Sequence, residues 1–220
     1  MQEKTTKDFK FARFFLDIGL DIVIVVVLVL FIQNFIFAPF RIHGPSMCDT
    51  FNSFNGECYN GDGEFILVSR FPVWDLFGWS PTELERGDVI VFQAPYSEKG
   101  EYYIKRVIGL PGDTILVKNG LVYLKNEEGR FIEWDEPYLN AENTGNTHPH
   151  RSSAETYEVP EDSYFVMGDN RIKSSDSRRC FQQLGCSENS SPYLDESFIE
   201  GEVKLVLFPF THFRWVSDLD

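Results

Sequence analysis

Hydrophobic and polar positions divide the chain into one long apolar run and a larger region of short alternating segments. The run over residues 19–38 reads GLDIVIVVVLVLFIQNFIFA and has no polar residue between Ile22 and Ile32. About 20 mostly apolar residues are needed to cross the hydrocarbon layer of a membrane as a helix. The pattern therefore predicts one membrane-spanning helix over residues 19–38, ended by Pro39.

Charges around this run predict its orientation. Four basic residues precede it: Lys4, Lys7, Lys10 and Arg13. Arg41 is the only basic residue close behind it, so residues 1–18 are expected in the cytoplasm and the chain after residue 39 outside. A cleaved signal peptide is one alternative, but residues 35–40 (FIFAPF) lack a small-x-small cleavage site. A buried helix of a soluble protein is another, and it would need a large helical partner that the remaining pattern does not predict.

After residue 39, short β-branched or aromatic runs alternate with turn residues. Asn119-Gly120, between two such runs, is the strongest hairpin signal in the chain. The predicted strands are residues 64–69, 88–93, 102–109, 114–118, 121–124, 163–167 and 203–208. Many short strands at this spacing predict a mainly β fold, an antiparallel β-sandwich or coiled barrel.

Two segments differ from this pattern. Residues 125–162 are polar and acidic and are predicted to be a small insertion or cap, leaving residues 39–124 and 163–220 as the β body. His148 and His150 lie in it without a partner motif, so a solvated loop is favoured over a metal pair. The aromatic segment 71–79 (FPVWDLFGW) fits a contact with the membrane interface and packing on the body equally well.

Composition and charge narrow the function classes. The chain has 43% hydrophobic and 25% charged residues, which is typical of a folded globular protein and not of a disordered one. Its formal net charge is −14, and all of it lies after residue 38, because residues 1–38 hold four basic and four acidic residues. A negative field of this size repels phosphate backbones, so no nucleic-acid partner is expected.

The four cysteines fit an oxidising compartment outside the cytoplasm. They allow three pairings, and proximity in the sequence favours Cys48 with Cys58 and Cys180 with Cys186. A four-cysteine zinc site is the alternative, but the short CxxC knuckles typical of such sites are absent. No metal and no cofactor are therefore expected.

Three stretches carry residues that could do chemistry. The first, residues 44–50 (GPSMCDT), follows the apolar run so closely that Ser46 must lie beside the membrane. By itself, a serine next to Gly-Pro is usually only a turn residue.

The second stretch, residues 102–109 (YYIKRVIG), holds two adjacent cations in a predicted strand. Neighbours in a strand point to opposite faces, so either Lys105 or Arg106 must face the core or a partly dry cleft. If Lys105 is the inward one, burial lowers its pKa toward neutrality and makes a free amine available as a base. An edge strand whose lysine extends to water is the alternative.

The third stretch, residues 168–178 (GDNRIKSSDSR), follows a predicted strand and is dense in hydroxyls, carboxylates and guanidiniums. Loops of this composition often hold a site together through side-chain hydrogen bonds. A solvated turn with an incidental ion pair is the alternative.

Together and in this order, GPSMCDTF, RGDVIVF, YIKRVIGLPGD and GDNR followed by SSDSR resemble the bacterial type I signal peptidases. These are membrane-anchored serine proteases that remove signal peptides from exported proteins, and the resemblance covers most of the chain. It implies that Ser46 is the nucleophile and that unprotonated Lys105 is the general base. It also implies that the backbone N–H of Ser46 contributes to the oxyanion hole, whereas Gly44 stands where some members carry a hydroxyl.

The resemblance also assigns supporting residues. Ser174 would orient the amine, and four further residues would brace the site through ion pairs: Asp169, Asp176, Arg178 and Arg106. The implied substrates are preprotein signal peptides, cleaved after small residues of the Ala-x-Ala type. The enzyme is expected to be a monomer anchored in the lipid bilayer of the cell membrane. Ile42, Met47 and the strand around residues 104–107 are candidates for the pockets that take the small residues.

One departure from the family pattern concerns the serine turn. Asp49 stands where the family usually has a proline, and we hypothesise that a Cys48–Cys58 bridge stiffens the turn instead. Two alternative functions remain. A catalytically silent, membrane-tethered β domain could bind exported chains, and a self-cleaving repressor of the SOS type shares the Ser/Lys chemistry. The repressor fits poorly, because the first 38 residues predict a membrane span and not a DNA-binding domain.

Overall fold

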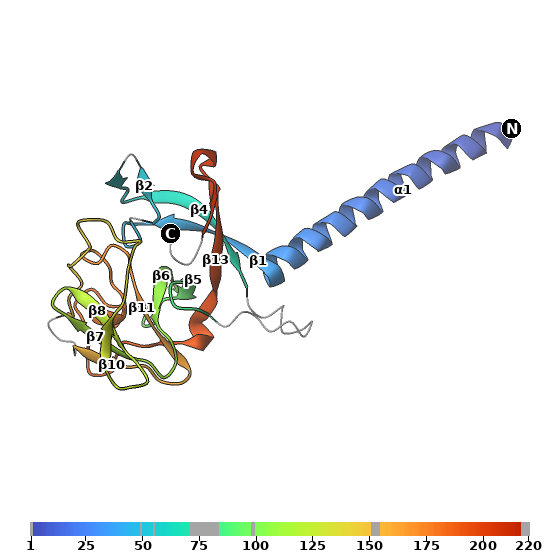
Figure 1. Ribbon diagram of the computed structural model, residues 1–220. Coiled ribbons are helices and arrows are strands. Elements are labelled where there is room, and N and C mark those ends of the chain that lie inside the picture. The colour runs from blue at the N-terminus through green and yellow to red at the C-terminus, as the bar shows by residue number, and fades with distance from the viewer. Residues whose placement is uncertain are drawn as a thin grey trace.

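The computed structural model describes residues 2–48, 50–54, 56–70, 84–97, 100–150 and 155–216, with side chains from residue 13 onward. The aromatic segment 71–79 and Asp49 lie outside the described residues, so the expectations about them stay predictions. In the described part, one long N-terminal helix leads into a body of β-strands (Figure 1).

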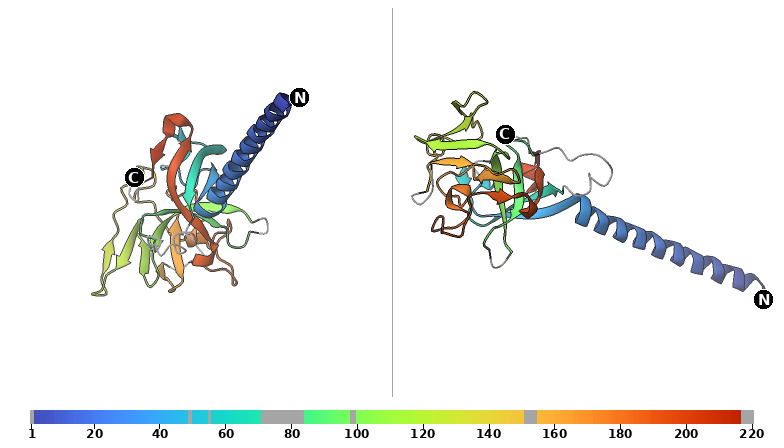
Figure 2. Two further views of the ribbon diagram at one scale, coloured as in Figure 1. Left: turned by 90° about the vertical axis from the view of Figure 1, so that its right-hand side faces the viewer. Right: turned by 90° about the horizontal axis from the view of Figure 1, so that it is seen from below.

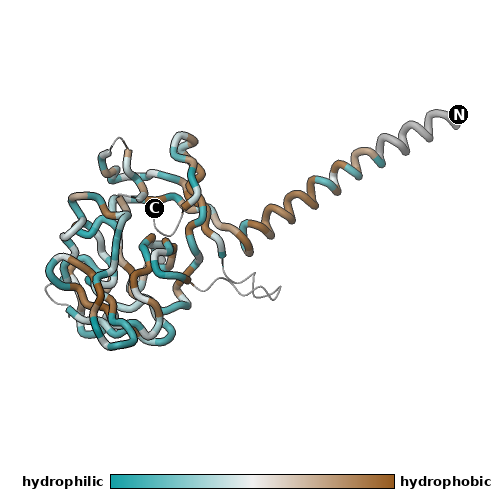
Figure 3. Tube along the Cα trace, viewed as in Figure 1, coloured by the Kyte–Doolittle hydropathy of each residue, from teal (hydrophilic) through white to brown (hydrophobic). Residues whose placement is uncertain are grey.

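The predicted apolar helix is present. Helix α1 spans Gln2–Phe31, and one π turn, Ile32–Ile36, connects it to strand β1 (Phe37–His43). The stretch Arg13–Ile36, with a mean hydropathy of 2.9, is the one described helix long and apolar enough to cross a membrane. Figures 2 and 3 show it projecting from the body, with its hydrophobic part nearest to the strands.

The end of the helix differs from the prediction. Pro39 does not terminate it, because the helix has already ended and Pro39 lies inside β1, paired with Leu67. The predicted span of residues 19–38 is therefore wrong at its C-terminal end by two residues, since β1 begins at Phe37. Strand β1 is an edge strand, where a proline is tolerated because one side of the strand has no partner to bond.

The main sheet has eight strands, and every pairing in it is antiparallel. Its spatial order is β1, β4 (Asp62–Ser69), β13 (Ile199–Phe208), β5 (Val89–Gln93), β6 (Tyr102–Gly109), β11 (Ser163–Met167) and β12 (Leu194–Asp195), with β14 (Arg214–Trp215) pairing with β13. All seven strands predicted from the sequence are present, and the mainly antiparallel β fold is confirmed.

The other strands of the described residues form two smaller sheets. The first has the order β10 (Thr156–Glu158), β7 (Thr114–Lys118), β8 (Leu121–Lys125) and β9 (Phe131–Glu133). The second pairs β2 (Ser53–Phe54) with β3 (Glu57–Cys58). Strands β9 and β10 come from the segment predicted to be a polar cap, and Tyr138, Tyr157 and Val159 of that segment are buried in a core cluster. The segment therefore adds apolar side chains to the core, while the division of the chain into domains stays a prediction.

Strand β6 lies at the centre of the body and is hydrogen-bonded on both edges, to β5 and β11. Its apolar residues enter three separate core clusters: Ile104 packs with Ile42 and Met47, Ile108 with Phe165, and Val107 with Phe92. Each of the three β6 side chains is buried. A strand held on both edges and both faces is fixed in position, and it carries Lys105 and Arg106.

Both cysteine pairs favoured by proximity are disulfides in the structure, Cys48 with Cys58 and Cys180 with Cys186. The first joins the chain just after Ser46 to strand β3.

Candidate active site

Ser46 lies in a turn directly after β1. The backbone N–H of Cys48 donates to the carbonyl of Pro45 at 3.0 Å, which closes the turn. Met47 and Phe51 anchor it, because both side chains are buried in the core cluster shared with β4 and β5. This places Ser46 Oγ 2.9 Å from Lys105 Nζ, although the two residues are 59 positions apart in the sequence.

Lys105 is nearly inaccessible to water, with 3% of its surface exposed. Its Nζ also contacts the carbonyl of Ile104 at 2.6 Å and lies 5.3 Å from the centre of the Tyr103 ring. Burial lowers the pKa of Lys105 from 10.5 to about 8, and this effect outweighs the opposing attraction of Asp176 and Asp169. A neutral amine is therefore accessible near physiological pH, next to a hydroxyl.

Arg106 is buried as well. Strand alternation requires only one of the two adjacent cations to be buried, whereas in the structure both are. On its own face, Arg106 makes a two-fold contact with Asp169: Nε donates to Oδ1 at 3.0 Å and Nη2 to Oδ2 at 2.9 Å. Nη1 donates to the carbonyl of Gly87, and the guanidinium stacks on the Tyr138 ring at 3.9 Å. Burial alone would lower the pKa of Arg106, but Asp169 outweighs it and the pKa is raised. The paired carboxylate is what makes the burial of a permanent charge tolerable.

Asp176 and Arg178 form a second buried ion pair, with Arg178 Nη2 2.7 Å from Asp176 Oδ2. The backbone N–H of Gly168 donates to the same carboxylate at 3.0 Å. Burial raises the pKa of Asp176, but the charge and hydrogen bonds of Arg178 and the Gly168 N–H outweigh it, so the pKa lies below its usual value. The pair therefore remains charged, and with the Gly168 N–H it braces the loop after β11 internally.

Gly168 is required by close packing around Ser46. A Cβ atom at this position would lie 2.4 Å from the carbonyl oxygen of Ser46 and 2.3 Å from Ser174 Oγ. The backbone N–H of Asn170, two residues later, donates to that same Ser46 carbonyl at 3.1 Å. The loop thus lies directly against the serine turn.

Ser174 does not make the contact that the resemblance implies. Its Oγ is buried beside Asp176, but it has no partner at hydrogen-bond geometry among the described residues. Lys105 Nζ instead contacts Ser46 Oγ and the Ile104 carbonyl. The role of Ser174 in orienting the amine stays a prediction.

The sequence reasoning assigned no role to Arg171, a buried residue of the same loop. Its guanidinium forms an ion pair with Glu136, and its Nη1 donates to Thr147 Oγ1 at 2.6 Å. Glu136 and Thr147 belong to the segment predicted to be a polar cap. The signal available was the arginine of GDNR itself, but its partner lies 35 positions away in a segment without a motif.

Ser46 and Lys105 open into a groove of about 630 Å³. One wall is the edge strand β1 from Phe40 to His43, and the other includes Tyr102, Tyr103 and Ile104 of β6. Ile42 and Ile104, two of the pocket candidates, line it, whereas Met47 is buried in the core under the turn. His148 and His150 line a different hollow, together with Arg178 and Arg179.

The family description that matches this arrangement is "Signal peptidase, peptidase S26", whose pattern covers residues 15–208. The chain belongs to this family. It is 34% identical over 218 residues to signal peptidase I P of Bacillus subtilis subsp. natto, covering 94% of this chain and 96% of the relative. It is 30% identical over 212 residues to signal peptidase IB of Staphylococcus aureus strain MRSA252, covering 89% and 91%.

A solved structure of a signal peptidase I from Enterococcus faecalis V583 is 28% identical to this chain, with a TM-score of 0.37 over 58% of this chain and 99% of that one. The family match reaches from the apolar helix through Ser46, Lys105 and the loop after β11. The match to the family therefore includes both the apolar helix and the segments that meet at the groove.

Proposed function

We propose that this signal peptidase is a membrane-anchored serine endopeptidase that removes signal peptides from exported preproteins, with Ser46 as nucleophile and Lys105 as general base. The observation that supports this most directly is the 2.9 Å contact between a half-buried hydroxyl and a buried amine of lowered pKa. The relatives are named signal peptidases. The contact between Ser46 and Lys105 is the arrangement that a serine peptidase with a lysine base would need.

The reaction would begin when neutral Lys105 Nζ accepts the proton of Ser46 Oγ while Oγ attacks the scissile carbonyl. The resulting ammonium would protonate the leaving amine as the C–N bond breaks, leaving an acyl group on Ser46. The amine, neutral again, would take a proton from the water that attacks the acyl-enzyme, and would return it to Ser46 Oγ as the signal peptide leaves. No histidine is needed: His43 is bonded to Asp62 and His212 to Glu64.

The negative oxygen of the tetrahedral intermediate would be stabilised by the backbone N–H of Ser46. Gly44 offers no side chain for this purpose, so backbone donors must do the work. The ion pairs of Arg106 with Asp169 and of Arg178 with Asp176 are buried, and both carboxylates attract the Lys105 ammonium. We assign them a supporting role, since the first joins β6 to the loop after β11 and the second braces that loop internally.

The groove suits an extended peptide. Strand β1 is an edge strand of the main sheet, so its free edge can pair with a substrate backbone. Ile42, Ile66 and Ile104 line the groove near Ser46, and this apolar lining suits uncharged side chains such as alanine next to the cleaved bond. We therefore propose cleavage after small residues, of the Ala-x-Ala type.

The anchor places this chemistry beside the membrane. Seven residues of β1 separate the end of the apolar helix from Gly44, and a strand of this length extends roughly 23 Å. With the basic residues before the helix kept in the cytoplasm, the groove would lie on the outer side of the cell membrane, within reach of a preprotein that is still in the bilayer.

The test is cleavage of a preprotein by the detergent-solubilised full chain. Ser46→Ala and Lys105→Met should each abolish cleavage, because one removes the nucleophile and the other the base. Lys118→Met, at an exposed lysine of β7, is the matched control and should retain wild-type cleavage. Full activity in either of the first two variants would refute the dyad. A wild-type chain that binds the preprotein without cleaving it would instead identify a tethered binding domain.

A further inference from the structure

The Ser46 turn, residues 44–48, is held at three successive carbonyl groups by three different donors. Asn52 Nδ2 donates to Gly44 O at 3.2 Å, Cys48 N to Pro45 O at 3.0 Å, and Asn170 N to Ser46 O at 3.1 Å. Each peptide plane on either side of the serine is thereby oriented by a hydrogen bond. The serine hydroxyl is not a member of this set, so these bonds serve the backbone.

The bond to Pro45 bears directly on the chemistry. The carbonyl of Pro45 and the N–H of Ser46 belong to one planar trans peptide group, and they point in opposite directions. Holding the Pro45 carbonyl toward Cys48 N therefore sets the direction of the Ser46 N–H, which is the proposed oxyanion donor. The peptide plane between Gly44 and Pro45 is also oriented, through the bond to Gly44 O. Because the ring of Pro45 restricts its φ, this plane further limits how the Pro45–Ser46 peptide plane can rotate.

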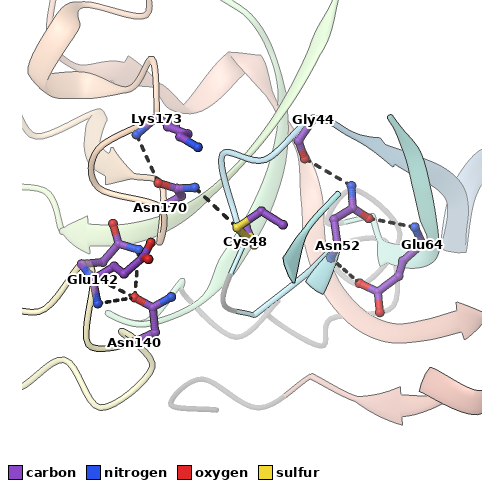
Figure 4. The surroundings of a disulfide bond; sticks show 10 residues. Gly44, Cys48, Asn52, Glu64, Asn140, Glu142, Asn170 and Lys173 are labelled. Atoms are coloured by element: carbon purple, nitrogen blue, oxygen red, sulfur yellow. Dashed lines mark hydrogen bonds between the residues drawn. A yellow bond between two sulfur atoms is a disulfide. The ribbon is translucent and has the colours of Figure 1, made fainter. Parts of the chain in front are cut away.

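Cys48 itself is held from outside the turn. Its disulfide to Cys58 connects it to β3, and β3 pairs with β2, the strand that follows the turn. Asn170 Nδ2 also lies 3.9 Å from Cys58 Sγ, so the loop after β11 contacts the bridge as well as Ser46 O. Figure 4 shows this bridge between Asn170 on one side and the Gly44–Asn52–Glu64 contacts on the other.

Asn52 is held in position by burial and by hydrogen bonds. It is fully buried and has a left-handed backbone with φ of 54°, and both polar atoms of its side chain are hydrogen-bonded: Nδ2 donates to Gly44 O and Oδ1 accepts from Glu64 N. Its Oδ1 lies 1.8 Å from where a Cβ on residue 63 would be, so Gly63 leaves room for it. Glu64, also buried, accepts from Asn52 N at 2.9 Å and is held by Arg214 and His212. The asparagine therefore links the Ser46 turn to a fixed ion-paired carboxylate of β4.

We propose that the Cys48–Cys58 disulfide and Asn52 are positioning elements that orient the Ser46 N–H as an oxyanion donor. This inference rests on the proposed function, because it assigns an effect to that same site. An N–H turned away from the developing negative charge stabilises the transition state less while leaving substrate binding intact. The positioning elements should therefore affect kcat and not KM.

The chain supplies its own matched control, because it has a second disulfide. Cys48→Ala with Cys58→Ala should lower kcat on a preprotein-derived peptide at least about 10-fold and leave KM unchanged within about two-fold. Affinity for a peptide aldehyde, which forms a tetrahedral adduct with the serine, should fall in proportion to kcat. Cys180→Ala with Cys186→Ala should lower the melting temperature while retaining kcat.

A second comparison covers the case in which the first double variant does not fold. Asn52→Gly keeps the left-handed backbone and deletes both side-chain hydrogen bonds, and it should lower kcat as the disulfide variant does. Asn119→Gly is its control, since Asn119 has the same φ of 54° in the exposed β7–β8 turn. Equal kcat values in the two disulfide variants, or losses confined to KM, would overturn the proposal. Wild-type cleavage that survives Ser46→Ala would instead overturn the proposed function.

Discussion

Cleavage by this signal peptidase should rise with pH and level off near the pKa of Lys105. The burial that surrounds Nζ lowers this pKa from 10.5 to about 8, which corresponds to about 3 kcal/mol of free energy disfavouring the ammonium. At pH 7, about one tenth of the molecules then carry the neutral amine that can accept the Ser46 proton. Below the pKa, kcat/KM should therefore fall about tenfold for each further pH unit.

The assay is the kcat/KM of a preprotein-derived peptide without titratable side chains, measured from about pH 6 to about pH 9 in detergent. The acid limb should have a single midpoint near 8. Lys105→Arg is the companion variant. A guanidinium keeps its proton throughout this range, so this variant should be inactive at every pH.

Two results would refute this reasoning. A flat profile between about pH 6 and pH 8 would mean that no group of this pKa controls the reaction. A limb with its midpoint near about 6.5, the usual value for histidine, would point to an imidazole base instead. Activity in Lys105→Arg would have the same consequence.

Two further predictions concern stability. Lys105→Met should abolish cleavage yet raise the free energy of unfolding at neutral pH by up to about 3 kcal/mol, because the unfolded lysine stays protonated up to 10.5 and the folded one only to about 8. The wild type should thus gain stability as the pH rises between these two values, and the advantage of the variant should vanish there; thermal unfolding that shows a less stable variant would contradict this. Asp169→Ala should cost about 3–5 kcal/mol, because it leaves the guanidinium of Arg106 buried and unpaired. Glu128→Ala, which removes an exposed partner of Arg130, is the control, and its midpoint in denaturant titrations should match the wild type. Equal midpoints for the wild type, Glu128→Ala and Asp169→Ala would show that the Arg106–Asp169 pair contributes nothing to stability.

Local patterns were sufficient for most of the architecture. The strands over residues 102–109, 114–118 and 163–167 have their predicted bounds, because alternation of side chains and turn residues are properties of neighbouring positions. The apolar helix is equally local. Its end was misjudged because Pro39, read as a helix stop, is accommodated in an edge strand, and edge status depends on which strands pair.

Residue types and motif order were enough to single out Ser46 and Lys105 as a candidate pair, and to mark the loop over residues 168–178 as its support. The relative positions and burial of these side chains could not be predicted from residue types and motif order. The sequence required only one of Lys105 and Arg106 to be inside, whereas in the structure both are, since Asp169 arrives from a strand end 63 positions away. Arg171 forms an ion pair with Glu136, and Asn52 is hydrogen-bonded to Gly44 and Glu64. The spacing of these residues in the sequence does not predict either set of contacts.

The chain by itself therefore determined the anchor, the strands and the reactive side chains that this protein possesses. Tertiary structure decided how those side chains behave. A lowered amine pKa requires the removal of water by residues from several strands, and the proposed direction of the Ser46 N–H depends on donors from the turn, from Asn52 and from the loop after β11. The first effect arises entirely from long-range packing, whereas the second combines a local turn with contacts from residues distant in the sequence.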